Sequence, residues 1–230
     1  MSEKNIKSPD FDQEPFDQRA LVIYGGGGHG QTLIDLVLAL GTFDIVGIVD
    51  DGLPAGSSVM DIEVLGGSDV LASLGAKGIR QAVNAVGGIG EMATRVKIFR
   101  TILEAGFHCP ALIHPSAAIE ASAQIGSGAQ ILPQAYIGTR TKIGFGVIVN
   151  SGAIVSHDCE IGEYAGLAPG ALLAGGVIIG EGAQIGMGVT INLQVSIGSR
   201  AQIGNSAVIK RDVPAGVVVH AGQVWPSNMS

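Results

Sequence analysis

Two neighbouring residues in the second half of the chain have the chemistry of a general base and of a group that orients it. His157 is followed directly by Asp158, in the segment NSGAIVSHDCEIG. An imidazole beside a carboxylate is well suited to accept a proton at neutral pH. Gly175 stands three hexapeptides after His157 and is followed by Gly176. If three hexapeptides make one turn of a coil, these glycines would lie over the histidine, leaving open space and a backbone N–H for a carbonyl oxyanion.

The spacing of aliphatic residues supplies that turn length. Every sixth residue from Ile113 to Ile209 is aliphatic. A helix or a flat strand would not hold a single apolar column at this period. The pattern predicts a hexapeptide-repeat parallel β-helix over residues 112–210, with three short strands in each turn. His157 lies two residues past Val155, which faces inward. We therefore expect the His157 side chain to point away from the axis of the coil.

Residues 19–111 predict a small Rossmann-like α/β domain that opens with a β-α-β unit. A buried strand, ALVIY, leads into the glycine loop GGGGHG, then a helical stretch and a second strand, FDIVGIV. Gly25, Gly27 and Gly30 satisfy G-x-G-x-x-G, and Asp50 follows the second strand. Such a loop lets the backbone approach a pyrophosphate at a helix N-terminus. The domain is shorter than the two halves that a dinucleotide spans, whereas a nucleoside diphosphate sugar needs only one.

Several residues around that loop are candidates for substrate binding. His29 lies inside the loop, where it would donate to a phosphate or a sugar hydroxyl; the alternative is a histidine that caps its own loop. A later strand ends at Asn84, and a second glycine turn at Gly87 and Gly88 follows it. In parallel sheets ligands bind at the carboxyl ends of the strands. We therefore expect Gly27, Gly30, Asp50, Asn84 and Gly88 at the mouth of one site.

The composition narrows the class of partner. The net charge is −7, so no basic stripe is present to neutralise nucleic acid phosphates. Glycines and polar residues interrupt every apolar run, which leaves no membrane span. Residues 1–18 are polar and acidic, and we expect a mobile tail and no signal peptide. Cys109 and Cys159 lack metal or redox spacing, which fits reduced thiols in a cytoplasmic protein. The histidine spacing predicts no metal site.

The chain resembles a family of bacterial acyltransferases that join a nucleotide-sugar-binding domain to a left-handed β-helix. The family includes sialic acid O-acetyltransferases and the N-acetyltransferases of bacillosamine and perosamine. The resemblance covers roughly residues 20–216. It is carried by five segments: GGGGHG from Gly25, VDD from Val49, LIHPSAAI from Leu112, SHDCEIGE around His157, and RDVPAG from Arg211.

The resemblance implies a homotrimer with active sites in the grooves between coils and acetyl-CoA lying along the coil. It implies that His157 deprotonates the acceptor, that Asp158 steadies the imidazole, and that the Gly175 N–H holds the oxyanion. Gly176 would then border the cofactor. Asp50 or Asp51, with His29, would contact the acceptor nucleotide.

The chain departs from the family at two places. Many relatives carry a second histidine in the segment GEYAGLAPGA, where this chain has Gly166. Relatives also end in a glycine-x-proline-alanine turn near the cofactor, whereas here the segment is HAGQVWPS. We expect residues 211–230 to be a C-terminal tail. Trp225 would either stack on the adenine of the cofactor or cap the open end of the coil.

The leading interpretation is acetyl transfer from acetyl-CoA to the amine of a nucleotide-linked 4-amino-4,6-dideoxyhexose, for a surface polysaccharide or glycan. One alternative is O-acetylation of sialic acid or another sugar, because a histidine base serves an amine or a hydroxyl. Another is a non-catalytic protein that binds a dinucleotide and uses the coil as a trimer scaffold. The glycine-rich pyrophosphate loop favours a nucleotide-linked acceptor.

Overall fold

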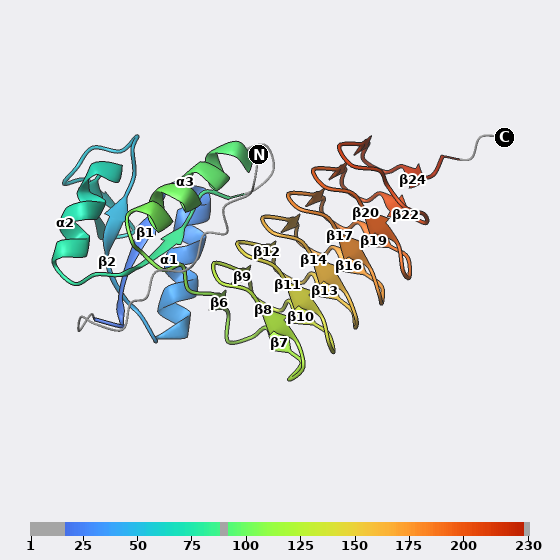
Figure 1. Ribbon diagram of the computed structural model, residues 1–230, viewed down its shortest axis with the longest axis horizontal. Coiled ribbons are helices and arrows are strands. Elements are labelled where there is room, and N and C mark those ends of the chain that lie inside the picture. Colours follow the sequence, from blue (N-terminus) through green and yellow to red (C-terminus); the bar gives the residue numbers. More distant parts are fainter. Residues whose placement is uncertain (1–16, 88–91, 228–230) are drawn as a thin grey trace, which may run out of the picture.

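The computed structural model describes residues 17–87 and 92–227. It contains an N-terminal α/β domain followed by a long coil of stacked strands (Figure 1). The N-terminal sheet has the order β3-β4-β2-β1-β5, and all its pairings are parallel except that of β3 with β4. Its strands are β1 (Ala20–Tyr24), β2 (Asp44–Val49), β3 (Ser58–Val59), β4 (Ile62–Gly66) and β5 (Gln81–Asn84). Its helices are α1 (Gly28–Leu40), the short 3-10 turn η1 (Ser68–Val70), α2 (Leu71–Ala76) and α3 (Met92–Glu104).

The predicted β-α-β opening is confirmed. Every residue of β1 is buried, as expected for a central strand of a parallel sheet covered on both faces. Helix α1 buries Leu33, Ile34 and Val37 against that sheet. The helix ends at Gly41, whose φ of 63° is a left-handed conformation that glycine adopts without strain. This arrangement fixes the glycine loop, and with it the start of α1, at the carboxyl end of β1.

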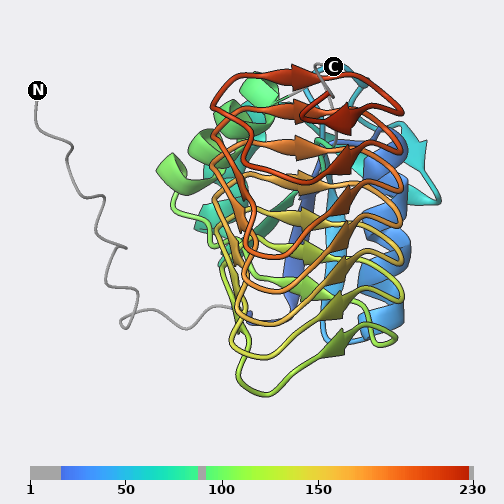
Figure 2. The same cartoon turned by 90° about the vertical axis from the view of Figure 1, so that its right-hand side faces the viewer.

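The second half of the chain is a left-handed parallel β-helix with three flat sides. Figure 2 shows the coil obliquely, with its three-sided turns stacked one above another. One side holds β6 (Leu112–Ile113), β9 (Gln130–Ile131), β12 (Ile148–Val149), β15 (Gly166–Leu167), β18 (Gln184–Ile185), β21 (Gln202–Ile203) and β23 (Val218–Val219). The next holds β7 (Ala118–Ile119), β10 (Tyr136–Ile137), β13 (Ile154–Val155), β16 (Leu172–Leu173), β19 (Thr190–Ile191), β22 (Val208–Ile209) and β24 (Val224–Trp225). The third holds β8 (Gln124–Ile125), β11 (Lys142–Ile143), β14 (Glu160–Ile161), β17 (Ile178–Ile179) and β20 (Ser196–Ile197).

The predicted turn of three hexapeptides is confirmed by the register of the strands. Val155 pairs with Leu173, and Ile161 with Ile179, so each residue faces the one that stands three hexapeptides further along the chain. The aliphatic column forms one continuous buried core through the coil. Close stacking also explains the glycines that follow many isoleucines, because a Cβ on Gly138 would lie 2.7 Å from the backbone nitrogen of His157. The aliphatic residues of the repeat therefore specify the interior of the coil, and its glycines allow the close approach of successive turns at the edges of this three-sided prism.

The coil continues into the segment that we expected to be a C-terminal tail. Val213 faces Ile197, whereas a full turn of three hexapeptides would bring Ala215 to that place. Strands β23 and β24 keep this shorter spacing, so that Val219 pairs with Ile203 and Trp225 with Ile209. The shorter turn shifts the hexapeptide period, although the backbone ladder is maintained. The period of six residues ends the predicted coil at residue 210, whereas the strand pairing continues to Trp225.

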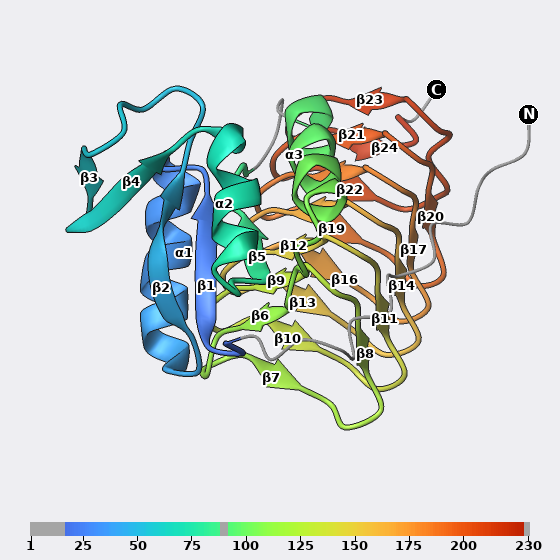
Figure 3. The ribbon, with the colours of Figure 1, turned by 60° about the vertical axis from the view of Figure 1, so that its left-hand side comes forward.

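Helix α3 joins the two parts of the molecule (Figure 3). Phe99 of α3 packs against two aromatic side chains of the coil, with ring centroids 4.9 Å from Phe145 and 5.8 Å from Tyr164. A second link is the hydrogen bond between His29 Nε2 and Gln130 Oε1, at 2.7 Å. Together these contacts place the glycine loop over one flat side of the coil. None of the described helices is long and apolar enough to cross a membrane.

Candidate active site

We define His157, Asp158 and Gly175 as the candidate catalytic edge of the coil, and the structure brings these three residues together. The imidazole of His157 lies directly against Gly175, since a Cβ there would be 2.5 Å from Cε1 and 2.6 Å from Nε2. The ring is exposed, and its Nδ1 lies 2.7 Å from Oδ2 of Asp158. Glycine at position 175 therefore makes room for the ring, as the stacking of successive turns requires.

Arg140 holds the Asp158 carboxylate from the turn below. Its Nε and Nη2 donate to the two carboxylate oxygens, at 2.7 and 2.8 Å. This hydrogen bonding from Arg140, followed by that from His157, lowers the pKa of Asp158 to about 2. An ionised carboxylate only accepts hydrogen bonds, so the proton of the neutral imidazole lies on Nδ1. His157 Nε2 is then left with the lone pair that a general base uses.

Gly175 and Gly176 have different roles in the backbone of this edge. The Gly176 N–H donates to the carbonyl of His157 at 2.9 Å, which ties successive turns together. Among the residues that the structure describes, no acceptor pairs with the Gly175 N–H. A free N–H beside a base is what a developing oxyanion requires.

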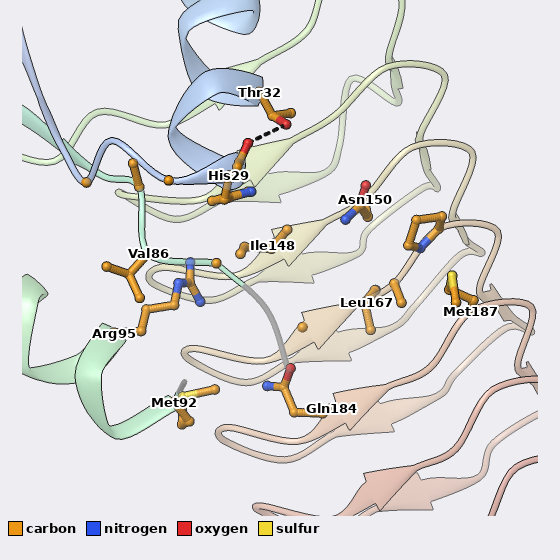
Figure 4. Close-up of a pocket in the computed structure, with 18 of the residues that line it drawn as sticks. His29, Thr32, Val86, Met92, Arg95, Ile148, Asn150, Leu167, Gln184 and Met187 are labelled. Carbon is orange, nitrogen blue, oxygen red and sulfur yellow. Dashed lines mark hydrogen bonds between the residues drawn. The ribbon is translucent and has the colours of Figure 1, made fainter. Parts of the chain in front are cut away.

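A separate cavity of about 690 Å³ lies between the glycine loop and the flat side of the coil (Figure 4). The loop and the start of α1 form one wall, and strands β12, β15 and β18 form the opposite one. Of the predicted substrate-binding residues, Gly27, His29 and Asp50 line this cavity. Gly27 and Gly28 face open space, because a Cβ on either would meet nothing within 4 Å.

The other predicted substrate-binding residues that the structure describes do not line the cavity. Gly30 is buried under the loop, where a Cβ would lie 2.1 Å from the carbonyl oxygen of Gly25. Asn84 is buried, and its Nδ2 donates to the carbonyl of Arg95 at 2.7 Å. Asp51 accepts from the Tyr24 hydroxyl at 2.7 Å. Gly88 lies outside the described residues.

The two acidic residues after β2 are both engaged in hydrogen bonds within the domain. Asp50 Oδ2 accepts from the Gly26 N–H at 2.7 Å, and its Oδ1 accepts from the N–H groups of Gly52 and Leu53. Asp51 also accepts from the Ser68 N–H at 2.7 Å, and these bonds lower the pKa of its carboxyl group. In this conformation both carboxylates fix the shape of the loops around the cavity.

His29 is held by a chain of hydrogen bonds across the domain boundary. Gln130 Nε2 donates to the carbonyl of Asn84 at 2.7 Å, so Gln130 Oε1 is left as the acceptor for His29 Nε2–H. Burial lowers the pKa of His29, which favours the neutral ring at pH 7. The side chain therefore both lines the cavity and links the glycine loop to the coil.

Sequence reasoning missed the cavity residues that come from the coil and from α3. They are Met92, Arg95, Ile148, Asn150, Gln184 and Met187. One signal for the residues from the coil was present in the sequence. Successive turns contribute one residue each to an outward column, which holds Gln130, Ile148, Gly166 and Gln184. At Gly166, a Cβ would lie 2.5 Å from Gln184 Oε1. The Gln184 side chain thus occupies the space beside this glycine.

Trp225 lies at the far end of the coil. It pairs with Ile209 in the last strand, packs against the core and donates its Nε1–H to the carbonyl of Asp212 at 3.0 Å. This is the capping arrangement that we considered from the sequence. The ring remains partly exposed.

The cavity and the catalytic edge lie on different parts of the prism. The cavity opens along the turns after β12, β15 and β18, at Asn150, Ala168 and Met187. His157 lies in the turn after β13, one strand further along the chain. The flat side that holds β13 and β16 separates the two within one chain.

The fold defines a hexapeptide-repeat acyltransferase that carries a small α/β domain at its N-terminus. Residues 20–102 match the model of the PglD N-terminal domain. The acetyltransferase domain of PglB from Neisseria gonorrhoeae FA1090 is 35% identical, with a TM-score of 0.79 over 88% of this chain and 96% of that one. The chain belongs to this family of sugar acetyltransferases and is an acyltransferase enzyme.

Two further solved structures are similar over most of their length. A mutant of perosamine N-acetyltransferase from Caulobacter crescentus, in complex with CoA and GDP-perosamine, is 32% identical. Its TM-score is 0.83 over 90% of this chain and 96% of that one. WeeI from Acinetobacter baumannii AYE is 28% identical, with a TM-score of 0.78 over 87% and 96%. No curated protein sequence matches this chain.

Proposed function

We propose that the enzyme transfers the acetyl group of acetyl-CoA to the amine of a nucleotide-linked 4-amino-4,6-dideoxyhexose of the perosamine or bacillosamine type. The observation that carries this proposal is the His157 imidazole, oriented by Asp158 and stacked on a glycine whose N–H is free. The similarity to a perosamine N-acetyltransferase solved with CoA and GDP-perosamine supports the choice of donor and acceptor.

In this mechanism each group has one task. His157 Nε2 takes a proton from the acceptor amine while the amine nitrogen attacks the thioester carbonyl. The C–N bond forms, and the carbonyl oxygen becomes an oxyanion that accepts from the Gly175 N–H. The C–S bond then breaks, and CoA leaves as the thiol after it takes the proton from His157 Nε2. Asp158 keeps the imidazole in the productive tautomer and stabilises its positive charge. Gly176 would border the cofactor along the coil.

The cavity is the place that we assign to the acceptor nucleotide. The N–H groups at the start of α1 lie beside the open positions Gly27 and Gly28, and no side chain caps this end of the helix. Such an end attracts the diphosphate of a nucleotide sugar. His29 and Asp50 line the same wall and would contact the nucleotide.

We propose a homotrimer in which neighbouring chains complete each active site. The separation of the cavity from His157 within one chain supports this assembly. On the flat side between them, Ile154 and Leu172 are each 41% exposed. Exposed apolar side chains of this kind are suited to burial against a second copy of the chain. A neighbour packed there would bring its catalytic edge to the mouth of the cavity.

The acceptor class can be tested with a panel of UDP-, GDP- and dTDP-linked 4-amino-4,6-dideoxyhexoses. We expect rapid release of free CoA from acetyl-CoA with at least one aminosugar, together with a product that is heavier by one acetyl group. The measurements are a thiol reagent and mass spectrometry. Sialic acid in the same assay tests O-acetylation. Turnover of sialic acid with an inert aminosugar panel would refute the proposed acceptor.

Mixing two inactive variants tests the shared site. His157→Asn removes the base, and Gly27→Glu places a carboxylate in open space at the acceptor wall without a clash. In randomly mixed trimers, about a quarter of the sites would combine an intact cavity with an intact neighbouring edge. We therefore expect co-refolding to restore about that fraction of wild-type turnover. If the mixture stays as inactive as its components, each site lies within one chain.

A further inference from the structure

Arg95, on the first turns of α3, is a buried cation that forms no ion pair with any of the described residues. The residue is 1% exposed and lines the cavity between the domains. Its Nε and Nη2 atoms are buried and have no hydrogen-bond partner within residues 17–87 and 92–227. Figure 4 shows the side chain extending from α3 toward the space below His29.

This arrangement is costly for the unliganded protein. Burial lowers the pKa of Arg95 to about 10, which leaves the guanidinium charged at pH 7. The Phe99 ring lies 5.3 Å from the guanidinium carbon, and a cation–π contact offsets only part of the desolvation. Among the described residues, no carboxylate pairs with Arg95. Buried charges are normally paired, so an unpaired one at a cavity wall points to an absent anion.

The rest of the cavity has the same surplus of donors. The uncapped start of α1 presents N–H groups beside Gly27 and Gly28. Asp50, the acidic residue that lines the cavity, already accepts from three backbone N–H groups. His29 uses its Nε2–H on Gln130 and is favoured in its neutral form. An anionic ligand would thus meet donors from both the loop and α3.

We propose that Arg95 binds the diphosphate of the acceptor nucleotide, opposite the N-terminus of α1. This inference rests on the proposed function, because it assumes a nucleotide-linked acceptor. The planar guanidinium fork donates two parallel hydrogen bonds to phosphate oxygens, a geometry that lysine does not provide. The ligand would also supply the hydrogen-bond partners that Nε and Nη2 lack.

The test uses the full-length protein and two signatures that a structural arginine would not give together. Arg95→Met keeps an unbranched side chain but removes the charge. We expect its dissociation constants for UDP, GDP or dTDP, measured by calorimetry, to rise by about 10- to 100-fold. Without ligand, its melting temperature should rise by about 2–4 °C, because the unpaired buried charge is gone.

Matched variants separate the possible outcomes. Arg100→Met makes the same change at an exposed position of α3, and should alter neither the affinity nor the melting temperature. Arg95→Lys should lose affinity for the diphosphate, because it lacks the fork. Acetyl-CoA affinity should stay unchanged in all three.

Two results would overturn the inference, and the first of them leaves the proposed function standing. One is a destabilised Arg95→Met protein that binds nucleoside diphosphates as the wild type does, which would make Arg95 structural. The other is unchanged diphosphate binding with a loss of affinity for N-acetylneuraminate, which would assign the guanidinium to a sugar carboxylate. If wild type binds no nucleoside diphosphate, both the acceptor class and this role of Arg95 are wrong.

Discussion

Replacement of His157 by asparagine is expected to lower kcat by about 10²- to 10⁴-fold, the usual contribution of a positioned general base. The amide has no lone pair on nitrogen that could take the proton of the acceptor amine. The KM for acetyl-CoA should change little, because the exposed imidazole makes no contact on which the coil depends. Steady-state kinetics of CoA release, with the folded state checked by circular dichroism, measures both quantities.

His114→Asn is the matched control for that variant. His114 is also on the coil, where its Nδ1 lies 2.8 Å from the hydroxyl of Ser116, and asparagine can form a similar bond. We expect wild-type turnover from this protein. A folded His157→Asn enzyme that is as active as His114→Asn would exclude His157 as the base.

Gly175→Ala is expected to have the second-largest effect, a loss of about 10²-fold or more in kcat. The new methyl group would lie 2.5 Å from Cε1 and 2.6 Å from Nε2 of His157, closer than atoms in contact can approach. Because His157 is exposed, the ring can swing outward. It would then leave both Asp158 and the oxyanion site. The melting temperature should fall only slightly, since the ring moves into solvent.

A double variant shows whether this loss acts through the imidazole. In a His157→Ala background the methyl group at position 175 has room, so Gly175→Ala should add little to the defect already present. Such non-additivity identifies residues that act as one unit. Losses that multiply in the double variant would instead mean that the methyl group acts elsewhere, for example on the oxyanion. Rates from single-turnover assays would provide the comparison.

The sequence predicted the coil correctly because its period is a local property that is repeated many times. Each hexapeptide places one aliphatic side chain on the axis, so the strand register and the contact of His157 with Gly175 follow from counting three hexapeptides to a turn. The same counting failed after Ile209, where a shorter turn keeps the ladder but shifts the period. The backbone continues its hydrogen bonds through this turn. The sequence pattern does not show this, because the aliphatic residues no longer follow the period of six.

The glycine loop was also predictable, but its neighbours across the cavity were not. Gly27 is identified by its spacing before a helix, whereas Arg95 and Gln184 reach the same space from α3 and from the coil. The angle between the domains brings them together, and it is set by contacts such as that of Phe99 with Phe145.

The sequence by itself determined the class of fold, the contact of His157 with Gly175 and the position of the glycine loop, because each depends on residues at fixed short spacings. Only the tertiary structure decided that Asp50 and Asp51 are engaged in loop hydrogen bonds, that His29 bonds to Gln130, and that Arg95 is buried without a partner. These facts depend on distances between segments far apart in the chain. Packing sets such distances, and no local pattern of residues encodes them.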